Sequence, residues 1–150
     1  MTNCDVIKEI LHTGIDLLSR REHSKKELLH KLLQRGHEPD DIVEVIEFLE
    51  SNQYLCEQRF TESVFRSRVN KGYGEKYIEQ ELMQKGIDSS LVNQVAAEMS
   101  VDWQEIAAQV YDKKFGNTPI KDDKNKAKRI RFMQYRGFSS HEIFALINAN

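Results

Sequence analysis

Residues Gly74–Leu91, GEKYIEQELMQKGIDSSL, decide the fold of this chain. Ile78 and Leu82 lie four residues apart with Met83 beside them, so a helix places all three on one face. Gly86 follows this apolar stripe, and glycine is the residue that most readily takes the left-handed conformation at a helix end. The segment after Gly86 offers two capping residues for a second helix, Asp88 and Ser89. The stretch therefore predicts two helices joined by a glycine turn.

The same pattern occurs twice more, in residues 24–46 (SKKELLHKLLQRGHEPDDIVEVI) and 125–147 (NKAKRIRFMQYRGFSSHEIFALI). The turn glycines stand at 36, 86 and 137, a period of about 50 residues, which is typical of a tandem array of one supersecondary unit. In every copy a basic residue precedes the glycine, a large residue follows it, and apolar residues come six, nine and ten positions later. These residues are Arg35, His37, Ile42, Val45 and Ile46; Lys85, Ile87, Val92, Val95 and Ala96; and Arg136, Phe138, Ile143, Leu146 and Ile147.

Composition favours helix over sheet, because Pro is scarce while Leu, Glu, Lys and Gln are plentiful. We expect an all-α fold of three tandem three-helix units, each resembling a helix-turn-helix, in an elongated and curved array. The expected units span residues 1–53, 54–100 and 101–150. A unit of this size buries its own apolar face poorly, so neighbouring units should pack together.

Several local features refine this expectation. Ser24 and Glu27 form a capping box, and Glu27 is placed to pair with Lys31 one turn later. The first helix is expected over 5–19, the fourth over 58–70 and the seventh over 101–115. Trp103, on the apolar side of the seventh helix, is expected to anchor the core. His23 comes just before a helix cap, which favours a structural role.

Catalytic, metal and cofactor sites are not expected. The five histidines stand in no pattern with Ser, Cys or Asp, and the carboxylates fall at solvent-face spacing. Cys4 and Cys56 form no CxxC pair, which argues against a zinc site or a disulfide framework. No apolar run reaches the roughly 18 residues of a membrane span, and the first residues lack the pattern of a signal peptide. We therefore expect a cytoplasmic, non-enzymatic protein, and we expect it to be a monomer.

Basic residues gather on the middle helix of each unit and on the segment before it, while the third helix of the first unit is strongly acidic. In a DNA-reading helix-turn-helix the helix after the turn enters the major groove, and carboxylates there would be repelled by phosphate. A base-reading role is thus poorly supported. For any single Lys or Arg, a solvated helix face is the simpler interpretation. The pattern's repetition favours contact with phosphates or with an acidic protein surface.

The chain carries Arg21-Glu22-His23-Ser24 with Glu27-Leu28, Tyr54-Leu55 with Arg59-Phe60, Arg68, Gly72 and Gly74, Glu81-Leu82 with Lys85-Gly86, and Arg136-Gly137-Phe138-Ser139. In these residues it resembles the RecX family of regulatory proteins, over nearly the whole length of the chain. One departure is Cys56, where the family commonly carries an acidic capping residue at the start of the fourth helix.

The resemblance implies a cytoplasmic bacterial protein of DNA repair and recombination that binds RecA, above all the RecA filament on single-stranded DNA. Most such proteins suppress the ATPase, strand-exchange and coprotease activities of RecA by lying in the filament groove, and some also bind DNA. We expect a basic face to meet acidic protein surface or phosphate within the filament. The alternative is an autonomous DNA-binding module, for single or double strands, that needs no protein partner. The residues expected on the basic face are Arg20, Arg21, Lys25, Lys26, Lys31, Arg66, Arg68, Lys71, Lys76, Arg129 and Arg136.

Overall fold

The computed structural model describes residues 2–148, and within them the chain forms nine α-helices and no strand. This confirms the all-α expectation. The helices are α1 (Asn3–Arg20), α2 (Lys25–Gln34), α3 (Pro39–Ser51), α4 (Glu57–Asn70), α5 (Glu75–Gln84), α6 (Ser89–Met99), α7 (Trp103–Phe115), α8 (Asp123–Tyr135) and α9 (Ser140–Asn148).

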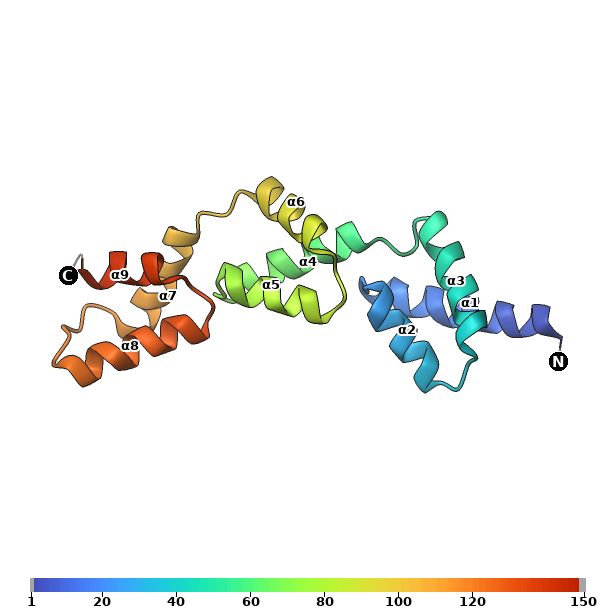
Figure 1. Cartoon of the computed structure of the whole chain (residues 1–150), viewed down its shortest axis with the longest axis horizontal. Coiled ribbons are helices and arrows are strands. Elements are labelled where there is room, and N and C mark those ends of the chain that lie inside the picture. The colour runs from blue at the N-terminus through green and yellow to red at the C-terminus, as the bar shows by residue number, and fades with distance from the viewer. Residues whose placement is uncertain (1, 149–150) are drawn as a thin grey trace.

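The helices pack in consecutive groups of three, and the groups follow one another in an elongated row with the two ends of the chain far apart (Figure 1). Each group encloses its own cluster of buried side chains. We call these groups unit 1 (α1–α3), unit 2 (α4–α6) and unit 3 (α7–α9). Two side chains pack against the cluster of the preceding unit. Leu55, which lies between α3 and α4, belongs to the cluster of unit 1, and Trp103, the first residue of α7, packs against the cluster of unit 2. Trp103 is therefore a partly buried contact at the second joint and not an anchor of its own unit's core.

The repeated glycine turn forms as predicted. Gly36, Gly86 and Gly137 adopt φ values of +88°, +82° and +98°, which side chains with a Cβ rarely adopt. Of the six apolar residues that stand six and nine positions beyond a turn glycine, five are buried and Leu146 is partly buried. The five buried residues are Ile42, Val45, Val92, Val95 and Ile143.

Local capping explains where several helices begin. The Ser24 hydroxyl accepts from the Glu27 amide while the Glu27 carboxylate accepts from the Ser24 amide, so the predicted capping box is present. Asp88 caps α6 through the Ser90 amide. Cys56 is the N-cap of α4 but makes no side-chain capping bond, which agrees with its departure from an acidic residue.

Neighbouring units meet through their middle helices. At the first joint, between units 1 and 2, the Lys26 ammonium donates to the carbonyl of Gln84 at the end of α5 (3.0 Å). At the second joint, between units 2 and 3, the amide of Gly74 donates to the carbonyl of Arg136 (2.7 Å) and the amide of Lys76 to that of Gly137 (3.2 Å). In both joints the carbonyl end of one middle helix thus faces the amide end of the preceding one, an arrangement that their dipoles favour.

Candidate partner-binding surface

The predicted basic residues differ in how exposed their side chains are and in whether an acidic residue of the chain pairs with them. Arg66, Lys71 and Lys76 have exposed side chains that make no hydrogen bond or ion pair within residues 2–148. Arg20 is also exposed, and its one ion pair joins it to Asp16 on the same helix (3.1 Å). Exposed pairs of this kind contribute about 0.5 kcal/mol or less, so Arg20 remains available to a partner.

At the first joint, basic side chains of both units bind a single carboxylate, that of Glu27. Glu27, whose side chain is 12% exposed, accepts from the Lys85 ammonium of unit 2 (3.0 Å) and from the Arg21 guanidinium (3.3 Å). Burial would raise the pKa of Glu27, but the hydrogen bonds from Lys85, Arg21 and the Ser24 amide outweigh it and lower the pKa. Glu27 therefore ties the two units together as a carboxylate, and the predicted pairing of Glu27 with Lys31 is wrong.

Lys31 turns instead toward His23. The two side-chain nitrogens lie 2.9 Å apart, and the other ring nitrogen of His23 lies 3.0 Å from the carbonyl of Arg21. Because the ammonium can only donate, His23 is the neutral acceptor in this pair. Burial, together with the nearby charges of Arg21 and Lys31, lowers the pKa of His23. The predicted structural role of His23 is confirmed, since the residue is 1% exposed.

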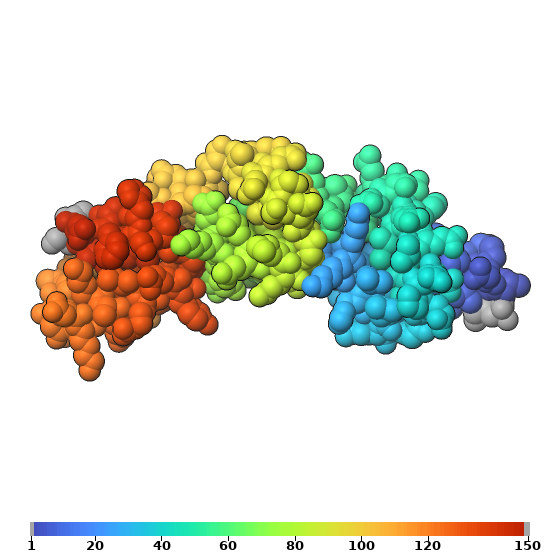
Figure 2. All heavy atoms as spheres, viewed as in Figure 1, coloured from blue at the N-terminus to red at the C-terminus, as the bar shows by residue number. Residues whose placement is uncertain are grey.

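A hollow of about 400 Å³ opens at this joint, where Figure 2 shows the surface indented between α2 and α5. Four of its lining residues carry positive charge and one carries negative charge, so the hollow is cationic on balance. It brings the predicted residues Arg21, Lys26 and Lys31, which are five or ten positions apart in the sequence, together with Lys85 of the next unit. The lining residues are Arg21, Lys26, Glu27, His30, Lys31, Gln34, Gln84 and Lys85.

A smaller hollow of about 150 Å³ lies nearby and is lined by both Arg21 and Arg68. Arg68 is held by Glu81 through two hydrogen bonds of 2.6 and 2.8 Å, and this ion pair raises its pKa. Lys25 pairs with Glu50 (2.7 Å), which likewise raises the pKa of Lys25. These cations are in large part compensated by partners inside the chain.

Two predicted residues of unit 3 are engaged by groups within the chain. Arg129 is 3% exposed, donates to the Tyr111 hydroxyl (2.8 Å) and lies over the Phe115 ring (4.9 Å). It is a core arginine and not part of the basic face. The guanidinium of Arg136 lies over the Tyr73 ring (4.8 Å) and donates to the carbonyl of Lys71 (3.0 Å), so Arg136 helps to form the second joint.

Two features of the surface were not predicted. The sequence identifies Lys85 as the basic residue before a turn glycine, but its ion pair with Glu27 depends on how units 1 and 2 dock. Lys113 and Lys114 at the end of α7 are exposed and border a further hollow with Arg136. Two consecutive lysines in the sequence are the feature that could have indicated this basic surface.

The described residues contain no group of three His, Cys, Asp or Glu side chains arranged to hold a metal ion. Within the same residues, no helix is both long and apolar enough to span a membrane. What the arrangement offers is a string of charged surfaces at the joints of an extended body, which is suited to binding a macromolecule.

Three family models match the chain in order. They describe the first, second and third three-helix domains of RecX and match residues 11–49, 57–95 and 101–147. Among curated relatives, the regulatory protein RecX of Vibrio parahaemolyticus is 44% identical over 130 residues, covering 87% of this chain and 84% of the relative. The regulatory protein RecX of Pseudomonas entomophila is 39% identical over 140 residues, covering 93% and 90%.

Solved structures are similar in fold. The crystal structure of RecX from Lactobacillus salivarius superposes with a TM-score of 0.83 at 23% identity and covers 97% of each chain. A second crystal structure of a regulatory protein RecX gives the same TM-score at 20% identity, covering 99% of this chain and 74% of that one.

Proposed function

The chain belongs to the RecX family of regulatory proteins, and from that premise we propose that it binds RecA and the RecA filament on single-stranded DNA. In this proposal it acts in the cytoplasm as a monomer, without catalytic chemistry of its own. It limits the ATPase, strand-exchange and coprotease activities of RecA by occupying the filament groove.

The observation that carries the proposal is the repetition of charged joints along an extended body. The unit 1–unit 2 joint has four cations around one carboxylate, and the unit 2–unit 3 joint again gathers lysine and arginine side chains. A filament presents the same subunit surface at regular intervals. An elongated array can therefore meet successive copies with successive units, and several weak contacts on one chain add to a strong one.

Groove occupancy accounts for inhibition without a catalytic step. A body that fills the groove obstructs the incoming duplex, so strand exchange fails on a filament that is saturated with this protein. Binding that depends on exposed Lys and Arg also weakens as salt rises, because screening shortens the range of surface charge.

The test uses charge reversals at Arg20, Arg66 and Lys76, whose side chains form no hydrogen bond or ion pair with another unit within residues 2–148. The control reverses three exposed lysines of unit 3: Lys121, Lys124 and Lys128. Both variants change the net charge by the same amount. We expect the wild-type protein to co-sediment with RecA filaments and to lower their ATPase rate. The Arg20→Glu, Arg66→Glu, Lys76→Glu variant should bind about tenfold or more weakly, as expected for the loss of several interfacial charges, and the control should bind nearly normally.

Two outcomes would overturn the proposal. If the protein does not co-sediment with RecA filaments at micromolar concentrations, the RecA filament is not its partner. Normal strand exchange on a filament saturated with the wild-type protein removes groove occupancy as the mechanism. Tight binding to short naked DNA, together with no preference for the coated filament, would instead favour the autonomous DNA-binding module.

A further inference from the structure

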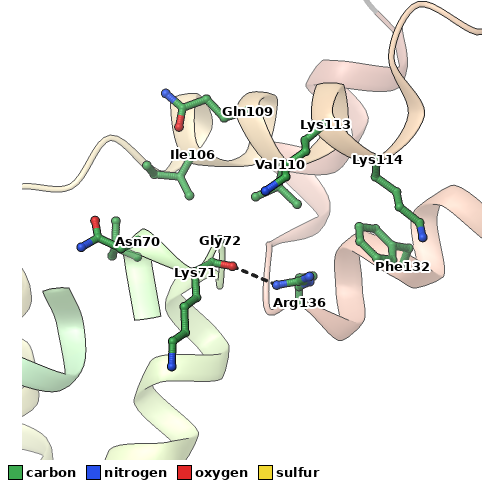
Figure 3. A pocket seen from close by; sticks show the side chains of 11 residues that line it. Asn70, Lys71, Gly72, Ile106, Gln109, Val110, Lys113, Lys114, Phe132 and Arg136 are labelled. Atoms are coloured by element: carbon green, nitrogen blue, oxygen red, sulfur yellow. Dashed lines mark hydrogen bonds between the residues drawn. The ribbon is translucent and has the colours of Figure 1, made fainter. Parts of the chain in front are cut away.

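The second joint contains a hollow of about 420 Å³ (Figure 3). Lys113 and Lys114 reach toward it from α7, while Arg136 approaches from the end of α8. Lys71 contributes its backbone carbonyl to Arg136, and its ammonium points away from the other cations. No carboxylate is among the lining residues, which are Val69, Asn70, Lys71, Gly72, Ile106, Gln109, Val110, Lys113, Lys114, Phe132 and Arg136.

Comparison of the two joints shows that this charge lacks the compensation found at the first. The basic residue before the turn glycine is Lys85 at the first joint and Arg136 at the second. Lys85 meets Glu27, nine residues before Gly36. The residue nine positions before Gly86 is Tyr77, which has no charge and stacks on Tyr73 (4.1 Å between ring centroids).

The three cations that face this hollow therefore form no ion pair with a carboxylate of the described chain. Within the described chain, the side chains of Lys113 and Lys114 form no ion pair, and Arg136 bonds only to a carbonyl. Three like charges around one hollow repel each other, and a bound anion relieves that repulsion. Arginine and lysine together are also the side chains that most often hold phosphate.

The wall of the hollow is apolar and partly aromatic. Ile106 and Val110 line it from α7, and Phe132 lines it from α8. The Phe132 ring lies 5.2 Å from the Lys114 ammonium and 5.6 Å from the Arg136 guanidinium. A ligand that fits must thus carry negative charge and a flat apolar group next to each other.

We propose that the hollow between units 2 and 3 binds a nucleotide of single-stranded nucleic acid. The phosphate lies among Lys113, Lys114 and Arg136, and the base packs against Phe132 and its aliphatic neighbours. A single strand can turn a base out to meet such a wall, whereas duplex bases are stacked and paired. This inference does not depend on RecA, because its test contains none.

The test measures fluorescence anisotropy of a labelled 12-mer of thymidylate with the full chain, over a series of salt concentrations. The variant Lys113→Gln, Lys114→Gln removes two exposed charges, and Lys121→Gln, Lys124→Gln is the control with the same charge change outside the hollow. We expect the first variant to bind about tenfold more weakly with a salt slope smaller by about 1, and the control to stay within about twofold of wild type. Equal losses in the two variants would overturn the site.

A second variant tests the missing carboxylate. Tyr77→Glu gives unit 2 the residue that unit 1 has at the same position and supplies an anion next to Arg136 while every lysine is kept. We expect it to weaken binding of the 12-mer, with unchanged helix content by circular dichroism. Undiminished affinity in Tyr77→Glu would contradict the role of the uncompensated cations.

Competing ligands identify which chemical group of the ligand the hollow recognises. We expect unlabelled thymidylate 12-mer to displace the probe better than an abasic 12-mer, inorganic tripolyphosphate or thymidine monophosphate. Equal displacement by the abasic strand would remove the base contact, and equal displacement by tripolyphosphate or the mononucleotide would mean that free phosphate compounds are the ligands. Equal displacement by poly-glutamate would overturn the phosphate assignment and indicate an acidic protein segment.

Discussion

Replacing each turn glycine by alanine separates the cost of the turn from the cost of joining the units. Gly36, Gly86 and Gly137 share nearly the same backbone conformation but have different surroundings. A Cβ at Gly36 would meet nothing within 4 Å, and one at Gly86 would lie 3.1 Å from the Lys26 side chain. A Cβ at Gly137 would lie 2.6 Å from both the Cβ and the backbone nitrogen of Tyr77. Gly36→Ala is therefore the matched control.

The expected costs follow from these surroundings. Alanine in the left-handed conformation costs about 1 kcal/mol at each site, and at Gly36 that is the whole effect. At Gly86 the nearest atom is the Cβ of Lys26, which moves only with its backbone, so the first joint must shift by a few tenths of an ångström at a small further cost. At Gly137 the clash involves backbone, so the second joint must open and lose the two bonds to the amides of Gly74 and Lys76. At about 1 kcal/mol each, their loss brings Gly137→Ala to about 3 kcal/mol.

Urea unfolding of the three variants measures the total cost, and amide hydrogen exchange locates it. We expect the amides of Gly74 and Lys76 to lose protection in Gly137→Ala and to keep it in Gly36→Ala. The reasoning is refuted if Gly137→Ala costs no more than Gly36→Ala, or if the two amides stay protected in both variants.

Three further changes test individual residues. Glu27→Gln should cost about 1–2 kcal/mol in urea unfolding at pH 7, because it removes the charged partner of Lys85. Since the pKa of folded Glu27 lies below its ordinary value of 4.5, that cost should fade as the pH drops through the folded value. Because the pKa of His23 is lowered in the folded protein, His23 takes up a proton in the unfolded chain at a higher pH than in the folded one. The free energy of unfolding of the wild-type protein should therefore decrease at pH values under about 6.5, by up to about 1.4 kcal/mol per pH unit. His23→Gln should weaken this dependence, as measured by urea titrations at pH 7.5 and 5.5. Arg129→Met should lower the thermal midpoint by several degrees, through the loss of about 1–3 kcal/mol of buried hydrogen bonding, while leaving filament binding unchanged.

The fold could be predicted from the sequence because its information is local. A glycine turn, a capping box and apolar spacing each act within about ten residues, and the period repeats them. Gly86, Ile78 and Val92 were assigned correctly for this reason. Trp103 was not, because a residue at the start of a helix can pack on either of two clusters, and only the docking of the units selects between them.

The charged surface was less predictable, since the same residue types serve two purposes. Arg21 and Lys26 look alike in sequence to Arg66, yet the first two contact groups at the first joint and the third is free. Arg129 has the same chemistry again but is enclosed by Tyr111 and Phe115. Which cations remain available depends on contacts across about 50 residues of sequence, which local patterns do not specify.

The third copy of the repeat differs from the first two in the length of its middle helix. Helices α2 and α5 each have 10 residues and are capped twelve positions before their turn glycines, at Ser24 and Gly74. Helix α8 has 13 residues and is capped fifteen positions before Gly137, at Asp122. The extra residues of α8 amount to about one helical turn at its amide end, which is the end at which α5 receives unit 3 through the amide of Gly74. The three copies therefore share the turn glycine but not the length of the middle helix, so the glycine spacing alone does not fix where each middle helix begins.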